Sequence, residues 1–272
     1  SVPTVGQDVV IANDMCVLLD ASTPSLGRLT VRGDLQFVDN QDLTLTANHL
    51  RIEGGRVMAG SKVAPFAHRA RLVIGAANPN LRSIEVYGVL QLVGLKHMTS
   101  WTKLTTPAPS GSSVARLQNK VDWGVGDEIV VTSGDENPSA FETAIISQFS
   151  VDGKTLALGS SLQYGHTAGS HLVSGGTTVD VSAEVGLLSR RIKIEDKGSG
   201  GCGILVGKLW KWEGSVELVD VELAGCSGAG GTNPMIEFQQ VGVPLPLRRD
   251  YFRSSRIRAC SFHSGSTTAI HA

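Results

Sequence analysis

The chain has 272 residues and a formal net charge of −1, so its composition does not favour binding to nucleic acid or to an acidic membrane surface. Glycine is abundant at 32 residues and aromatic residues make up only 5%, a combination typical of many tight turns between short strands. No long apolar run is present, so the sequence predicts no membrane span in this segment. The polar start shows no signal peptide, and we expect either a cleaved signal or a piece of a longer chain.

Short strands separated by glycines dominate the first third of the chain. Two apolar strands are expected within residues 8–20, and three similar segments follow at residues 29–37, 50–58 and 84–92. Each of the three alternates apolar and polar residues around a central glycine, which predicts a strand, a bend and a second strand, with Leu29, Ile52 and Val86 facing inward. Such a repeat is typical of a solenoid with stacked rungs. The sequence therefore predicts an all-β fold, a right-handed parallel β-helix, with Phe66 packed over one rung.

Residues 105–178 have a different pattern. Residues 105–113 are rich in proline, serine, threonine and glycine, which predicts a loop. Strands are expected at residues 114–117, 128–132, 143–148 and 155–158, and Asp152-Gly153 signals a hairpin turn between the last two. We interpret this region as a small antiparallel β module inserted in, or stacked on, the solenoid.

Rungs are expected again from residue 179 onward. Residues 192–194, 221–223 and 260–262 align as one stacked column, and residues 204–206, 236–238 and 270 as the next. Residues 241–250 are rich in proline and basic residues and are expected to leave the solenoid surface. The chain ends in the middle of a rung without a polar cap, so we expect it to be a fragment of a longer protein.

Four cysteines stand at positions 16, 202, 226 and 260, and none forms a Cys-x-x-Cys pair, so no zinc or redox motif is expected. They are either the disulfides of a secreted protein or small buried apolar residues. Cys202 precedes one predicted strand and Cys226 follows a strand of the neighbouring rung. We therefore predict a disulfide between these two, with Cys260 pointing into the core beside Val221.

Several motifs resemble a known family. Gly6-x-Asp8-Val-Val-Ile and Leu26-Gly-x-Leu-x-Val-x-Gly33 resemble the G-eight (eight-glycine) domain of fibrocystin-like proteins. The same domain occurs in the family of the cell-migration-inducing hyaluronan-binding protein and the transmembrane cell-surface hyaluronidase. Residues 121–129, 162–166 and 183–190 extend the resemblance over nearly the whole chain. The resemblance implies a G-eight domain at residues 1–104, a small β module at 105–178 and parallel β-helix rungs at 179–272. It also implies an extracellular or cell-surface location reached through the secretory pathway.

Acidic residues in the β module could carry glycan-cleaving chemistry, because glycosidases use two carboxyl groups. The candidates are Asp127, Asp135 and Glu142, and the resemblance implies that acidic positions in this module act in hyaluronidase-like relatives. This chain carries Asn137 where the second acid of the family motif would stand, and an amide cannot act as a general acid. The alternative is a solvated hairpin loop in which Asp127 caps a turn, and we predict that the segment lacks glycan-cleaving activity.

Histidine and tryptophan provide two further candidate sites. The family's β-helix carries two histidines on one strand, whereas this chain has Glu237 and Gln239 there, so no metal and no cofactor are predicted. Trp210 and Trp212 would share one face of residues 209–213 and could stack on sugar rings. Alternatively, they pack over a turn and cover the core.

These features favour an extracellular or cell-surface structural or adhesion module of a larger protein, in which a rigid β-solenoid presents a docking surface to other extracellular proteins or glycans. The alternatives are a carbohydrate-binding module and a hyaluronidase-like polysaccharide-degrading enzyme. The fold alone does not decide between them, because one fold hosts many functions.

Overall fold

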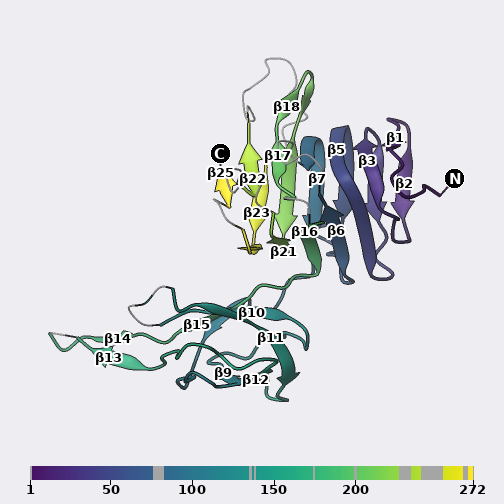
Figure 1. Cartoon of the computed structure of the whole chain (residues 1–272). Helices are drawn as coiled ribbons and strands as arrows, with labels where there is room; N and C mark the ends of the chain where they lie inside the picture. Colours follow the sequence, from purple (N-terminus) through teal and green to yellow (C-terminus); the bar gives the residue numbers. More distant parts are fainter. Residues whose placement is uncertain are drawn as a thin grey trace. The chain divides into compact units, whose positions relative to one another are not determined.

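The computed structural model (Figure 1) describes residues 2–75, 83–134, 137, 139–173, 175–198, 201–226, 234–239, 254–265 and 269–271. Within these ranges all regular structure is β-strand, and no helix that could cross a membrane is found there. The chain divides into two compact units. We call Ser1–Lys96 with Arg190–Ala272 the stacked unit and His97–Ser189 the small unit.

Fifteen strands of the stacked unit form one sheet in which the pairings are parallel. The first seven are β1 (Val9–Ile11), β2 (Cys16–Leu19), β3 (Leu26–Val31), β4 (Asp34–Phe37), β5 (Leu43–Ala59), β6 (Ala70–Ile74) and β7 (Ile84–Val93). The others are β16 (Ile192–Asp196), β17 (Ile204–Val206), β20 (Ser215–Val219), β21 (Val221–Ala224), β22 (Ile236–Phe238), β23 (Arg256–Arg258), β24 (Ser261–His263) and β25 (Ile270–His271).

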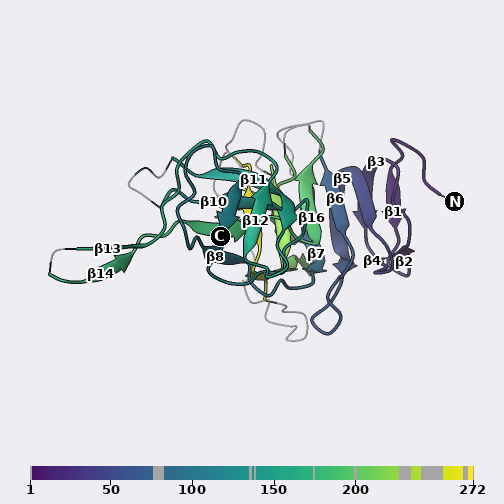
Figure 2. The same ribbon diagram turned by 90° about the horizontal axis from the view of Figure 1, so that it is seen from below.

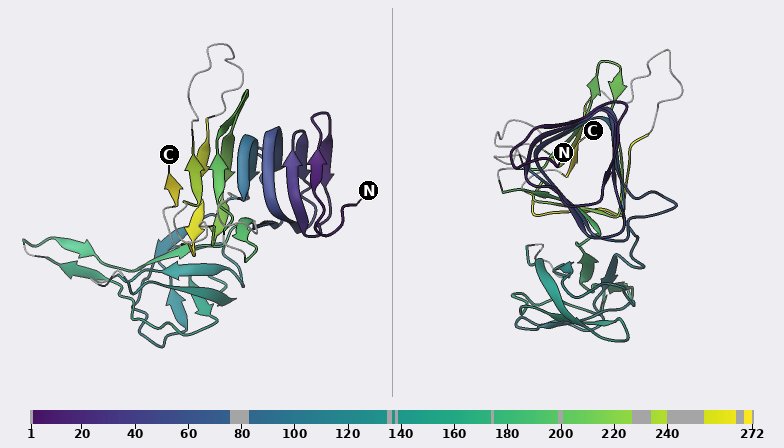
Figure 3. Two further views of the ribbon diagram at one scale, coloured as in Figure 1. Left: turned by 45° about the horizontal axis from the view of Figure 1, so that its top comes forward. Right: turned by 90° about the vertical axis from the view of Figure 1, so that its right-hand side faces the viewer.

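The pairings arrange these strands in three columns. One column runs through the start of β5, then β6, β16, β21 and β24. A second runs through β1, β3, the middle of β5, β7, β17, β22 and β25. The third runs through β2, β4, the end of β5, the end of β7, β20 and β23. Figures 1 and 2 show successive strands side by side, and the right panel of Figure 3 shows that the stacked unit traces a roughly triangular outline.

The three glycine-marked segments stack in the register that their sequence pattern predicts. Leu29 pairs with Leu50, which pairs with Ile84, so that equivalent apolar residues lie above one another. Leu29, Ile52 and Val86 are all buried, as predicted. The central glycines meet where the second and third columns join: a Cβ on Gly88 would lie 2.4 Å from the carbonyl oxygen of Gly55. Only glycine fits there, because the backbones of successive rungs approach too closely for a side chain.

The core of the stacked unit lies between the three columns. Alternate residues of each strand point inward and form one continuous apolar cluster, which is how stacked rungs bury a core that no single rung could bury. Phe66 is fully buried, and its ring meets that of Phe37 edge to face at a centroid distance of 6.4 Å. The packing predicted for Phe66 is therefore confirmed. The two columns predicted after residue 179 are confirmed as well: Ile192 pairs with Val221 and Ile204 with Ile236. The predicted excursion at residues 241–250 lies outside the described residues.

The small unit has its own antiparallel sheet and its own core. Its strands are β8 (Trp101–Lys103), β9 (Val114–Arg116), β10 (Glu128–Val131), β11 (Glu142–Phe149), β12 (Thr155–Leu158), β13 (Ser170–Leu172), β14 (Thr178–Asp180) and β15 (Glu184–Leu187). Six of them pair in the order β8-β15-β10-β11-β12-β9, and β13 pairs with β14. The four strands predicted in this region are present, and so is the hairpin turn, in which Gly153 adopts a positive φ of 70°.

The antiparallel sheet also includes strands on both sides of the predicted module. β8 precedes residue 105 and β15 follows residue 178, and β15 lies between β8 and β10. Val185 and Leu187 of β15 point into the core of the small unit. Their alternation suits a parallel rung and an antiparallel strand equally well, because both have a side-chain period of two.

Candidate functional site

The first acidic candidate closes a turn. A side-chain oxygen of Asp127 accepts a hydrogen bond from the backbone N–H of Gly124 at 2.7 Å, and the N–H of Asp127 donates to the carbonyl of Gly124 at 3.2 Å. Asp127 therefore acts as the turn cap that the sequence offered as the alternative to catalysis. The second candidate, Asp135, lies outside the described residues.

The third candidate, Glu142, lies at the start of β11 and is held by three donors. Its carboxylate accepts the backbone N–H of Gln163 at 2.7 Å, the N–H of Tyr164 at 3.0 Å and Nε2 of His166 at 2.8 Å. Burial acts to raise the pKa of Glu142, but these three donors outweigh it and hold the pKa below its usual value. Glu142 is therefore kept as an anion, which suits a structural anchor and not a proton donor.

His166 is the partner of Glu142 that sequence reasoning did not identify. Its side chain is completely buried, and its Nδ1 lies 2.7 Å from the carbonyl oxygen of Thr132. Both ring nitrogens thus lie within hydrogen-bonding distance of oxygen atoms, so the ring bridges the Thr132 carbonyl and the Glu142 carboxylate. The pair joins the ends of β10 and β11 to the segment before β13.

The two tryptophans occupy different places on a small hairpin of the stacked unit. β18 (Lys208–Leu209) pairs with β19 (Trp212–Glu213), so Trp210 lies in the turn and not on a strand. Trp210 has a positive φ of 55° and is 91% exposed, whereas Trp212 packs so closely on Gly54 that a Cβ there would lie 2.5 Å from the indole nitrogen. In the structure the two tryptophans therefore do not share one face as expected, because the chain reverses direction at Trp210. Figure 3 shows this hairpin extending beyond the triangular outline of the stacked unit.

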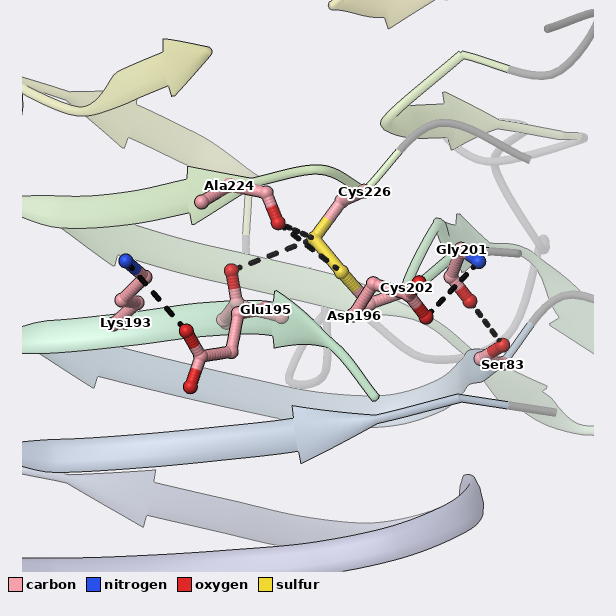
Figure 4. The surroundings of a disulfide bond; sticks show 9 residues. Ser83, Lys193, Glu195, Asp196, Gly201, Cys202, Ala224 and Cys226 are labelled. Carbon is pink, nitrogen blue, oxygen red and sulfur yellow. Dashed lines mark hydrogen bonds and ion pairs between the residues drawn. A yellow bond between two sulfur atoms is a disulfide. The ribbon is translucent and has the colours of Figure 1, made fainter. Parts of the chain in front are cut away.

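A disulfide joins Cys202 to Cys226, the pair predicted from the sequence, with Cα atoms 4.3 Å apart (Figure 4). Cys202 lies before β17 and Cys226 after β21, so the bridge links the turns of neighbouring rungs. The rung below is tied to the same turn, because the hydroxyl of Ser83 donates to the carbonyl of Gly201 at 2.6 Å. This corner is therefore a covalent and hydrogen-bonded staple of the stack.

The other two cysteines are free thiols. Cys16 is exposed on β2. Cys260 is partly buried against the core, and burial raises the pKa of its thiol. It therefore behaves as the small apolar residue predicted at this position. Directly after β22, the side-chain amide of Gln239 donates to the carboxylate of Glu237 at 2.6 Å, so the two residues found where the resemblance led us to look for histidines bind each other.

The chain is similar in sequence to known proteins. Residues 1–105 match the family profile of the G8 domain. The chain is similar to fibrocystin-L of Homo sapiens, with 31% identity and 99% of this chain covered, and to fibrocystin of Mus musculus, with 27% identity and 100% covered. It spans only 7% of the length of each of these relatives. Among solved structures, the Pseudomonas phage phi297 tailspike gp61 is 11% identical over 71% of this chain and 29% of that chain, and its TM-score of 0.31 is too low to establish a shared fold.

Proposed function

We propose that this chain, which carries a G8 domain and is similar to fibrocystin-like proteins, is a structural or adhesion module of a larger extracellular or cell-surface protein. Its stacked unit is a right-handed parallel β-helix that serves as a rigid spacer and presents its outer faces to other extracellular proteins or glycans. In this module the stacked unit, Ser1–Lys96 with Arg190–Ala272, supplies the rungs, and the small unit, His97–Ser189, is a separate antiparallel β module.

The in-register parallel stacking carries this proposal. Three columns of parallel strands enclose one continuous apolar core, and parallel crossovers within one sheet are almost always right-handed. A disulfide ties neighbouring rungs, and disulfides persist mainly in oxidising, extracytoplasmic surroundings. A rod held together in this way resists bending and offers long, flat faces, which suits a spacer better than an enzyme with moving parts.

A bead-adhesion assay with the folded chain tests this proposal. Beads coated with the oxidised chain should be retained by cells or by immobilised matrix proteins. Beads coated with chain that has been reduced and unfolded provide the matched control and should not be retained. Equal retention of both preparations, or of neither, would refute the adhesion role. A crystal structure with antiparallel pairing between β5 and β7 would refute the β-helix.

Glycan binding is a second candidate function, favoured by one observation. Trp210 is 91% exposed in a tight turn, and the next residue, Lys211, holds its ammonium 6.0 Å from the ring centroid of Trp212. An exposed indole offers a flat apolar face for a sugar ring, and the neighbouring ammonium can donate to hydroxyl or acidic groups. In this proposal Trp212 supports the hairpin by packing on Gly54, and Trp210 makes the contact.

A glycan array probed with the wild-type chain and with Trp210→Ala tests this second function. The exposed position makes a folding defect improbable as an explanation for lost binding, and Gly54→Ala, which would displace the supporting Trp212, offers a second variant. Binding that Trp210→Ala leaves unchanged would exclude the hairpin as the glycan site. A hyaluronidase-like enzyme is the least supported reading, because Asp127 caps a turn and Glu142 is held as an anion by His166.

A further inference from the structure

The loop between β8 and β9 bends at Thr105 and Thr106 and is fixed near its middle. The N–H of Ala108 donates to the carbonyl of His166 at 2.9 Å, and the N–H of His166 donates back to Ala108 at 2.8 Å. Ala108 is buried, while Thr106, Pro107 and Pro109 on either side of it are exposed. The loop is therefore held against the small unit at one residue and presents the flanking residues to solvent.

Three of the five side-chain hydroxyl groups in residues 105–113 already donate hydrogen bonds to backbone carbonyls. Thr105 donates to the carbonyl of Arg116 at 3.3 Å, Ser110 to that of Gln163 at 2.8 Å and Ser112 to that of Val114 at 3.0 Å. The two others belong to Thr106 and Ser113, which are exposed and make no side-chain hydrogen bond within the described part of the chain. A group attached to either of these oxygens would break no hydrogen bond of the fold.

The prolines distinguish Thr106 from Ser113. Thr106 is followed directly by Pro107, and a second proline, Pro109, stands three residues after it. A residue before proline is biased away from the helical region, and each proline fixes its own φ, so the backbone around Thr106 has few accessible conformations before any enzyme binds it. Threonine- and serine-rich segments that contain proline are the composition that carries O-linked sugars in secreted proteins. Ser113 has no proline within the following residues 114–119.

We propose that Thr106 is an acceptor for mucin-type O-glycosylation by a nucleotide-activated N-acetylhexosamine. The Thr106 oxygen attacks the anomeric carbon of a UDP-linked N-acetylgalactosamine, and a new C–O bond forms. The bond between that carbon and the phosphate oxygen breaks, UDP leaves with the electron pair, and the hydroxyl proton passes to the diphosphate or to solvent. In the cell this modification rests on the proposed passage through the secretory pathway, whereas the acceptor geometry does not depend on it.

An enzymatic assay on the folded chain tests the acceptor itself. Purified, unglycosylated chain with its disulfide formed is incubated with a polypeptide N-acetylgalactosaminyltransferase and UDP-N-acetylgalactosamine, and intact mass is measured. We expect one hexosamine per chain, located at Thr106 by fragmentation, absent in Thr106→Ala and unchanged in the matched control Ser113→Ala. Pro109→Ala should slow the transfer several-fold. Because Thr106 makes no hydrogen bond in the described structure, thermal unfolding of Thr106→Ala should match wild type.

The possible results distinguish whether Thr106 can accept the sugar from whether it is modified in the cell. No transfer to the folded chain, or transfer that persists in Thr106→Ala, would overturn the proposal. Transfer in the assay together with an unmodified chain secreted from glycosylation-competent cells would refute modification in the cell while leaving the acceptor geometry supported. A chain that those cells fail to export at all would instead count against the extracellular function.

Discussion

Removing the disulfide should destabilise the stacked unit by an amount that can be worked out from the structure. Cys202 and Cys226 are separated by 24 positions in the sequence. Cross-linking over that separation removes loop-closure entropy from the unfolded chain worth about 3.5 kcal/mol at room temperature. Replacing both cysteines with alanine should therefore lower the free energy of unfolding by about 2–4 kcal/mol, since strain and residual structure commonly alter the ideal value.

The location of the effect provides a second, independent readout. In a stack of rungs each rung contacts mainly its neighbours, so loss of the staple should loosen β16, β17 and β21 more than β3 or β5. Hydrogen exchange of backbone amides would measure this difference, and denaturant titration would measure the free energy. The control is Cys16→Ala, which removes an exposed free thiol and should leave both measurements unchanged.

Two results would refute this reasoning. The first is a doubly substituted chain whose denaturation midpoint and slope equal those of wild type, because the staple would then contribute nothing. The second is a loss of protection spread evenly over all rungs, because the stack would then unfold as one cooperative unit and not as a series of neighbouring rungs.

Three further predictions follow. Glu142→Gln should destabilise the small unit by about 3 kcal/mol, because a neutral amide replaces a carboxylate that accepts two backbone N–H groups and contacts the buried His166 ring, and chemical denaturation would show it. Folding lowers the pKa of Glu142 below its usual value of 4.5, so the stability that the Glu142 carboxylate contributes is fully present above pH 4.5 and is lost as the pH falls through the lower folded pKa. The melting temperature of Glu142→Gln should therefore fall less than that of wild type between pH 6 and pH 3. Gly88→Ala should disrupt the stack through its clash with Gly55, while Gly124→Ala, with 3.6 Å of space, should not.

The register of the stack was predictable from sequence because the rung repeats itself. Leu29, Leu50 and Ile84 occupy the same place in three similar segments, and stacking equivalent residues is the arrangement that buries all three at once. The glycine at the centre of each segment added a physical reason, since close approach of backbones excludes a side chain. Because each rung repeats the same sequence pattern, the pattern that predicts one strand also predicts how the strands stack.

The partners of β15 were not predictable in this way. Val185 and Leu187 alternate as residues of a parallel rung do, yet the strand lies antiparallel between β8 and β10. Strand direction depends on which segments the chain brings together, and a period of two is the same in both arrangements. The turn at Trp210 was not predictable for a related reason: residues 209–212 contain no glycine or asparagine, so no local signal indicates that a tryptophan there adopts a positive φ.

The candidate catalytic acids illustrate why a carboxylate cannot be interpreted from its position alone. Glu142 stands close in sequence to other acidic residues, which made it a reasonable catalytic candidate, but its chemistry is set by Gln163, Tyr164 and His166, more than twenty positions further along the chain. Those contacts exist only after β11 has paired and the segment before β13 has folded back. A carboxylate that accepts two backbone N–H groups and lies 2.8 Å from Nε2 of His166 is favoured in its anionic form. The contacts that hold Glu142 in the fold are therefore those of a structural anchor, and only the folded chain brings them together.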